Sequence, residues 1–135
     1  MKSLRNLSHM IYVDDDEDDR MMFQETMEEL FPSINLRLYE NGKEFLDDLV
    51  RNITNLPQLV FMDLNMPIKN GFECLEEIRL NNVLKQIPIA VYSTSSSQID
   101  RQRSLQLGAR HFLTKPTSFG AMKTLLGDTV RAYLD

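Results

Sequence analysis

The sequence has almost no cysteine, no long apolar run and no excess of positive charge. Cys74 is the only cysteine in the 135 residues, which excludes an internal disulfide and a zinc cluster, and we expect it to be a small buried apolar residue. No apolar run approaches the length of a membrane span, and the N-terminus lacks the apolar block of a signal peptide. A net charge of -5 disfavours a protein held on nucleic acid by phosphate contacts. We therefore expect a cytoplasmic protein that binds neither nucleic acid nor membrane.

The sequence also has no low-complexity segment, no internal repeat and no linker. Its length suits one domain of ordinary size, and its 42% hydrophobic and 26% charged residues are average for a globular protein. Residues 1–7 are predicted to be a short polar lead-in that is loosely ordered at its start. Residues 1–135 are therefore predicted to form a single domain.

The most informative stretch of the chain is residues 59–67. Residues 59–62 are apolar without alternation, which predicts a strand buried on both faces, as in a parallel sheet covered by helices. Asp63 follows directly, so its carboxylate should lie at the carboxyl edge of the sheet, where open α/β sheets bind ligands. A proline and the Asn70-Gly71 turn then take the chain away from the sheet. Taken alone, Asp63 could also be an ordinary loop carboxylate after a core strand.

Strand and helix patterns alternate five times along the chain. The predicted strands are residues 9–13, 35–39, 59–62, 89–93 and 111–114, the second being an edge strand. The apolar positions of the first, third and fourth helices are Met22, Phe23, Met27, Leu30 and Phe31; Phe72, Leu75 and Ile78; and Ile99, Leu105 and Leu107. The second helix is predicted to place Phe45, Leu46, Leu49 and Val50 on its inner face, and the last helix to bury Phe119, Met122, Leu125, Leu126, Val130 and Tyr133. Ser97 is a natural N-cap, and Gly108 suits the C′ position of the same helix. Crossovers of this length indicate an α/β fold with helices on both faces of a five-stranded parallel sheet, a doubly wound arrangement.

An unbroken acidic run covers residues 14–19, directly after the first predicted strand. Part of it complements the dipole of the following helix, but Asp14 and Asp15 come before any helix can start. The run also matches a calcium-binding EF-hand loop at Asp14, Asp16, Asp18 and Glu25. Asp19 stands where that loop needs a glycine, and a strand pattern precedes it. We therefore disfavour the EF-hand.

The ends of four predicted strands should bring five chemically active residues to one edge of the sheet. These are Asp14, Asp15, Asp63, Ser93 and Lys115. Three close carboxylates repel one another unless a cation lies among them, and a small set of hard oxygen ligands suits Mg²⁺. Asp63 is then the natural nucleophile for phosphorus, with the metal and Lys115 stabilising the charge of the transferred group and Ser93 donating a hydrogen bond. Singly, Lys115 could be a surface lysine and Ser93 a helix cap, but chance does not readily explain the whole set.

These motifs resemble those of response regulator receiver domains, the aspartate-phosphorylated partners of histidine kinases. The matching segments are residues 13–16, 62–67, 92–94 and 113–116, with Gly108-Ala109 before the last strand. The intervals from Asp63 to Ser93 and from Ser93 to Lys115 are those of the compact chemotaxis regulator. The resemblance covers nearly the whole chain and implies a flavodoxin-like (βα)5 fold with strand order 2-1-3-4-5. It also implies a stand-alone receiver without an output domain.

The resemblance implies a metal site around a phosphorylated aspartate. Asp63 would be the phosphoacceptor. Asp15, Asp63 and the backbone carbonyl of Asn65 would bind Mg²⁺ directly, and Asp14 would bind it through a water. Lys115 would contact the phosphoryl group.

The resemblance implies a second set of residues that respond to phosphorylation. Ser93 and Thr94 would contact the phosphoryl group together with Lys115, and Ser93 and Phe112 would form the switch pair. The bond before Pro116 would be a cis peptide. Phe112 departs from the family's tyrosine by lacking a hydroxyl, so its inward and outward positions must differ by packing alone.

The implied function is a phosphorylation-activated switch in a two-component or phosphorelay system. A histidine kinase or histidine phosphotransfer protein passes a phosphoryl group to Asp63 with Mg²⁺. Ser93 and Phe112 then move, and the face made by the fourth helix, fifth strand and fifth helix changes shape for an unknown downstream protein. Such a chain catalyses only its own phosphorylation and dephosphorylation and is not otherwise an enzyme. A homodimer through the switching face is possible. The segment before Asp63 is a few residues longer than in the chemotaxis regulator, as in regulators similar to those paired with bacterial phytochromes.

Two other functions compete with the switch. A magnesium phosphatase of the haloacid dehalogenase type would carry a second Asp two residues after its nucleophile, where this chain has Asn65, and would have a cap domain. A binding module that never uses phosphate would not need the complete residue set. Both are therefore disfavoured.

Overall fold

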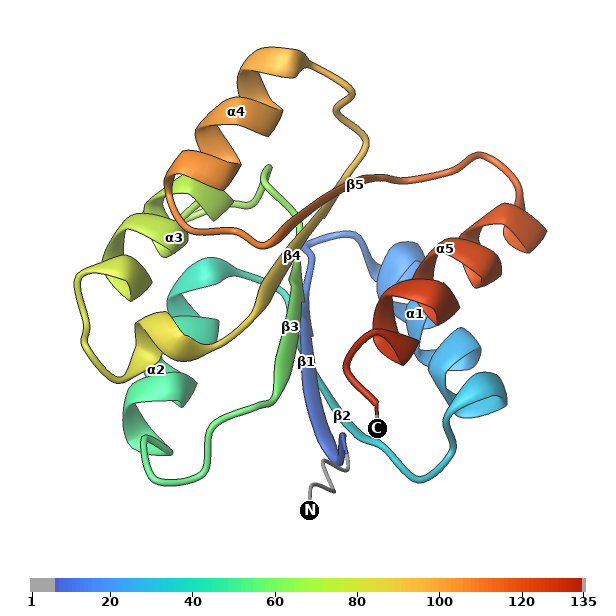
Figure 1. Ribbon diagram of the computed structural model, residues 1–135, viewed down its shortest axis with the longest axis horizontal. Coiled ribbons are helices and arrows are strands. Elements are labelled where there is room, and N and C mark those ends of the chain that lie inside the picture. The colour runs from blue at the N-terminus through green and yellow to red at the C-terminus, as the bar shows by residue number, and fades with distance from the viewer. Residues whose placement is uncertain (1–6, 135) are drawn as a thin grey trace.

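A computed structural model describes residues 7–134, and it consists of a parallel sheet between two layers of helices (Figure 1). The strands are β1 (His9–Val13), β2 (Asn35–Tyr39), β3 (Leu59–Met62), β4 (Ile89–Ser93) and β5 (His111–Thr114). They are all parallel and lie in the order β2-β1-β3-β4-β5. The predicted strand ranges, strand order and fold class are confirmed.

Two helices cover one face of the sheet and three cover the other. The helices are α1 (Glu17–Leu30), α2 (Gly42–Arg51), α3 (Gly71–Arg79), α4 (Gln98–Gln106) and α5 (Phe119–Arg131), with a 3-10 turn η1 (Leu84–Gln86) before β4. Figure 1 shows α1 and α5 on one side and α2, α3 and α4 on the other. Ser97 caps α4 as predicted, and Gly108 follows it with a φ of 108°, a conformation that glycine adopts without strain. Within residues 7–134, none of these helices has the length and apolar character needed to cross a membrane.

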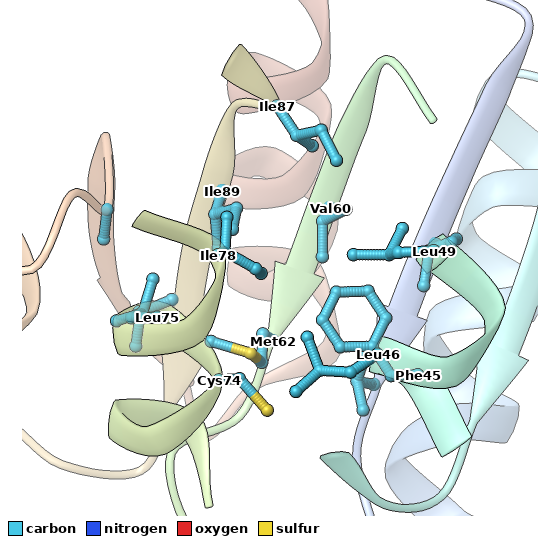
Figure 2. Packing of buried hydrophobic residues seen from close by; sticks show 14 of the residues in the cluster. Phe45, Leu46, Leu49, Val60, Met62, Cys74, Leu75, Ile78, Ile87 and Ile89 are labelled. Carbon is cyan, nitrogen blue, oxygen red and sulfur yellow. The ribbon is translucent and has the colours of Figure 1, made fainter. Parts of the chain in front are cut away.

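The two faces of the sheet are packed by different side chains, because alternate strand residues point to opposite faces. On the side of α2 and α3 the packing is mostly aliphatic, and Val60 lies between the strands and the Phe45 and Leu49 side chains of α2, with Met62 in the same cluster (Figure 2). Cys74 is buried in this layer, as predicted.

The side of α1 and α5 is aromatic. Phe23 of α1 stacks on Tyr12 with ring centroids 4.1 Å apart and meets Phe61 edge-on at 5.1 Å. Tyr92 adjoins the same group of rings. Aromatic packing therefore extends along this face toward the carboxyl ends of β1 and β4.

Most of the apolar helix residues named from the sequence are shielded, but five are exposed. Met22, Val50, Ile99, Leu105 and Phe119 have exposed fractions of 38, 59, 76, 39 and 48%. Successive helical residues are rotated by about 100°, so an apolar residue beside a buried one, such as Val50 beside Leu49, can point outward. The prediction of an inner position is therefore wrong for Val50 and Phe119.

The predicted lead-in lies outside the described residues except for Leu7, which is buried in the aromatic layer. Next to it, the hydroxyl of Ser8 and the backbone N–H groups of Ser8 and His9 donate to Oε1 of Gln58. The start of β1 is thereby tied to the segment that leads into β3.

Candidate functional site

The carboxyl edge of the sheet brings together the five residues predicted from the strand ends. Asp14, Asp63 and Ser93 are buried, and Asp15 is exposed. One carboxylate oxygen from each of the three aspartates lies within 4.8 Å of the others. The predicted meeting of the carboxylates is therefore present in the folded chain.

The backbone around Asp63 fixes the position of its carboxylate. The Asp63 N–H donates to the Val13 carbonyl at 3.0 Å, and the Leu64 N–H donates to Asp63 Oδ1 at 2.8 Å. Gly71 begins α3 with its N–H bonded to the Leu64 carbonyl, and a Cβ at Gly71 would lie 2.7 Å from the Asp63 carbonyl oxygen. The Asn-Gly pair seen in the sequence therefore allows α3 to start directly against the site.

Lys115 reaches the carboxylates from the end of β5. Its Nζ lies 2.7 Å from Asp14 Oδ2, 2.8 Å from Asp19 Oδ2 and 3.6 Å from Asp63 Oδ2, and its side chain is 9% exposed. Burial alone would lower the pKa of Lys115, but the hydrogen bonds to Asp14 and Asp19 outweigh it and raise the pKa. The ammonium therefore stays charged.

The Asp63 carboxylate is poorly compensated. Burial raises the pKa of Asp63 to about 6; Lys115 opposes this rise, and the charge of Asp14 adds to it. One lysine faces several carboxylates here, so the site has an excess of negative charge. The hard oxygen donors of Asp14, Asp15 and Asp63 therefore fit a divalent cation such as Mg²⁺.

The other predicted residues lie around this centre. Ser93 is fully buried, and its hydroxyl accepts a hydrogen bond from the Ser95 N–H at 3.2 Å. Thr94 and Asn65 follow the ends of β4 and β3 and are exposed. Phe112 is half-buried against the aliphatic layer. Their roles in binding metal and phosphate and in switching stay predictions.

The prediction of a cis peptide before Pro116 is wrong. No cis peptide occurs between residues 7 and 134, so the Lys115–Pro116 bond is trans. Trans is the isomer that a proline amide favours by about 0.5–1 kcal/mol.

Sequence reasoning missed Tyr12 and Asp19. The Tyr12 hydroxyl donates to Oδ2 of Asp14, the atom that also accepts from Lys115, while the Asp16 N–H donates to Oδ1 of Asp14 at 3.0 Å. Asp19 lies in the first turn of α1, one turn after Asp15, and this spacing could have indicated that it faces the site. The dipole of α1 accounted for an acid at that position, so its contact with Lys115 went unpredicted.

The chain matches the family model of the response regulator receiver domain over residues 10–126. It is 30% identical to the probable methanogenesis regulatory protein FilR2 of Methanothrix harundinacea, over 93% of this chain and 83% of that protein. Among solved structures, the phosphorylated cyanobacterial phytochrome response regulator RcpA superposes with a TM-score of 0.85 at 26% identity, over 93% of each chain. The Mn(2+)-bound form of response regulator Rcp1 gives a TM-score of 0.84 at 26% identity, over 95% of each chain. Other curated relatives are longer, and the chain spans 15% of one and 44% of another.

Proposed function

The chain belongs to the response regulator receiver family of two-component systems, and from this membership we propose that it is a switch activated by phosphorylation of Asp63. The observation that carries the proposal is the position of Asp63, buried at the carboxyl edge with two further carboxylates and Lys115 around it. The phosphorylated state of the similar regulator RcpA supports it.

We propose that the three aspartates hold Mg²⁺, with Asp14 acting through a water and the backbone carbonyl of Asn65 as a further ligand. The carboxylate donor set and the Mn(2+)-bound form of Rcp1 support a divalent cation. When bound, the cation neutralises the carboxylates and stabilises negative charge on the transferred phosphoryl oxygens.

The residues of the chain then have separate tasks in phosphoryl transfer. A carboxylate oxygen of Asp63 attacks phosphorus while the bond from phosphorus to the donor's histidine nitrogen breaks, which leaves an acyl phosphate on Asp63. Lys115 binds a phosphoryl oxygen, and the hydroxyl of Ser93 and the Thr94 segment bind the others. The walls formed by the buried strand ends keep most of the solvent away from Asp63.

The response to phosphorylation passes through Ser93 and Phe112. Movement of the buried Ser93 hydroxyl toward the phosphoryl group opens space for Phe112, and the surface of α4, β5 and α5 changes shape for a downstream protein. The donor is a histidine kinase or phosphotransfer protein in the cytoplasm, and the same surface can pair two copies of the chain. The chain acts on no substrate beyond its own phosphoryl group.

The test is the intact mass of the protein after incubation with acetyl phosphate, with and without Mg²⁺. Wild type should gain one phosphoryl group only with Mg²⁺, and Asp63→Asn should gain none. Asp18→Asn, which changes an exposed acid in the same acidic run, should behave as wild type. Absence of the gain in wild type, or its persistence in Asp63→Asn, would overturn the proposal.

A further inference from the structure

Lys115 is held in this structure by a carboxylate that the receiver motifs do not include. Its ammonium has three N–H donors, and two of them point to Asp14 at 2.7 Å and Asp19 at 2.8 Å. Asp63, the proposed phosphoacceptor, lies 3.6 Å away, beyond hydrogen-bond distance. The lysine is therefore bound beside the phosphorylation site and not directly to it.

Stabilisation of α1 does not account for the position of the Asp19 carboxylate. Glu17, Asp18 and Asp19 all complement the dipole from the first turn, and Asp16 caps the helix by accepting from the Asp19 N–H. Of these acids, only Asp19 reaches Lys115, whereas Glu17 and Asp18 are exposed. Asp19 thus makes an additional contact that couples α1 to the end of β5.

The two carboxylates that hold Lys115 differ in how easily they can release it. Asp14 is completely buried and also accepts from the Tyr12 hydroxyl and the Asp16 N–H, so it is fixed in place. The Asp19 side chain is 26% exposed, so water can solvate it once the lysine leaves, and a partly exposed ion pair is weak. The Asp19 contact is the one that can open.

We propose that Asp19 is a positioning residue that holds Lys115 in a resting place and competes with the phosphoryl group on Asp63 for the ammonium. Phosphorylation moves one N–H of Lys115 from the Asp19 carboxylate to a phosphoryl oxygen, and Asp19 turns to solvent. Asp19 thereby sets how readily the chain accepts and retains the phosphoryl group. This inference rests on the proposed function of Asp63.

The first experiment compares Asp19→Asn with wild type in saturating Mg²⁺. Acetyl phosphate supplies the phosphoryl group, acetate leaves, and intact mass gives the rate. Removal of the competing carboxylate should raise the phosphorylation rate and the affinity for the phosphoryl analogue beryllofluoride by about twofold to fivefold, the range for loss of one partly exposed ion pair.

Asp18→Asn is the matched control, because it removes the same charge from the same helical turn without touching Lys115. An equal increase in both variants would mean that the net charge of the acidic run repels the donor, and it would overturn the inference. No increase in Asp19→Asn would overturn it too. Asp19→Glu, which keeps the charge, should stay closer to wild type than Asp19→Asn.

A second readout needs neither metal nor phosphate. The Nζ–H signal of Lys115 in nuclear magnetic resonance reports the hydrogen bonds of the ammonium, and it should shift or broaden in Asp19→Asn but not in Asp18→Asn. An unchanged signal would show that Asp19 does not hold the lysine in solution. If wild type itself takes no phosphoryl group, the proposed function fails; if wild type is phosphorylated and Asp19→Asn matches it, only this inference fails.

Discussion

Along β3 the effect of burial reverses from one residue to the next. Residues 59–62 are completely enclosed by the two apolar layers, and burial of a large apolar side chain stabilises a fold by about 1.5–3 kcal/mol. Asp63 follows with 8% exposure, and burial, to which the charge of Asp14 adds, raises the pKa of its carboxyl group to about 6. Burial therefore stabilises the fold in the interior of the sheet and destabilises it at the carboxyl edge.

This contrast explains why the site lies where it does. The enclosed strands and the hydrogen bond from the Asp63 N–H to the Val13 carbonyl set the backbone positions of the buried Asp14 and Asp63, so their carboxylates stay close together. A divalent cation bound among the carboxylates would relieve their repulsion. Substitutions should therefore have opposite signs in the two regions, with losses of stability in the interior and gains at the edge.

The largest effect is expected in the interior. Phe45 on α2 is fully buried, and Phe45→Ala should lower the free energy of unfolding by about 3–5 kcal/mol because it leaves a cavity in the aliphatic layer. Val50→Ala on the same helix, where the side chain is 59% exposed, should change it by less than about 0.5 kcal/mol. Urea unfolding measures both, and similar losses for the two variants would contradict the packing described for α2.

A gain of opposite sign is expected at Asp63. Its folded pKa of about 6 lies above the ordinary aspartate pKa of 3.8, so the ionised carboxylate destabilises the fold. This penalty is fully present well above pH 6 and fades as the pH falls toward the ordinary pKa of an aspartate. Without metal, Asp63→Asn should raise the free energy of unfolding by about 1–3 kcal/mol at pH 7.5 and by almost nothing near pH 4.

Chemical denaturation at the two pH values tests this gain, with Asp18→Asn as the control in the same site region. Mg²⁺ should narrow the difference between Asp63→Asn and wild type, because it binds and stabilises mainly the wild type. If Asp63→Asn were less stable than wild type at pH 7.5, the ionised Asp63 carboxylate would not destabilise the fold, and the contrast between edge and interior would be wrong.

Tyr12 lies on the boundary between the two regions. Its ring belongs to the aromatic layer, and its hydroxyl donates to the buried Asp14 carboxylate. Tyr12→Phe keeps the ring and should lower the free energy of unfolding by about 1–2 kcal/mol, because Asp14 loses a donor. Tyr92→Phe is the control, since the described residues offer no hydrogen-bond partner to the Tyr92 hydroxyl, and it should change stability by less than about 0.5 kcal/mol. If Tyr12→Phe and Tyr92→Phe changed stability equally in thermal unfolding, the Tyr12 hydroxyl would not stabilise Asp14, and Tyr12 would contribute only through its ring.

The sequence was sufficient to predict the frame of the site. The strand ranges follow from apolar runs bounded by turn residues. Because parallel strands deliver their carboxyl ends to one edge, these ranges alone predict that Asp14, Asp63 and Lys115 meet there. Helical periodicity was less informative. It identifies an apolar stripe on a helix but not which residues at the margins of that stripe are covered by the sheet and which are exposed. Val50 and Phe119 were therefore placed inward and are exposed.

The contacts that cross between elements could not be predicted. Strand alternation assigns Tyr12 to the aromatic face but says nothing about how far its hydroxyl reaches around the sheet edge. Asp19 had a sufficient local explanation in the dipole of α1, and only the fold shows that Lys115 extends to the same turn. Contacts of side chains across the edge of the sheet, such as those of Tyr12 and Asp19, depend on the tertiary structure and not on the local sequence.

The smallest expected effect concerns the backbone of the edge. Ile68, in the loop between Asp63 and α3, has a φ of 67°, which is unfavourable for a β-branched residue, and its side chain is 72% exposed. Ile68→Gly should relieve the strain and raise the free energy of unfolding by about 0.5–1 kcal/mol after allowance for the freedom of glycine in the unfolded chain. Ile68→Ala removes the same exposed apolar surface but keeps a Cβ, so it should show little of this gain in urea unfolding. A rise in the free energy of unfolding in both variants would mean that the exposed Ile68 side chain, and not its backbone, destabilises the fold. A rise in neither variant would mean that the carboxylates alone destabilise the edge of the sheet.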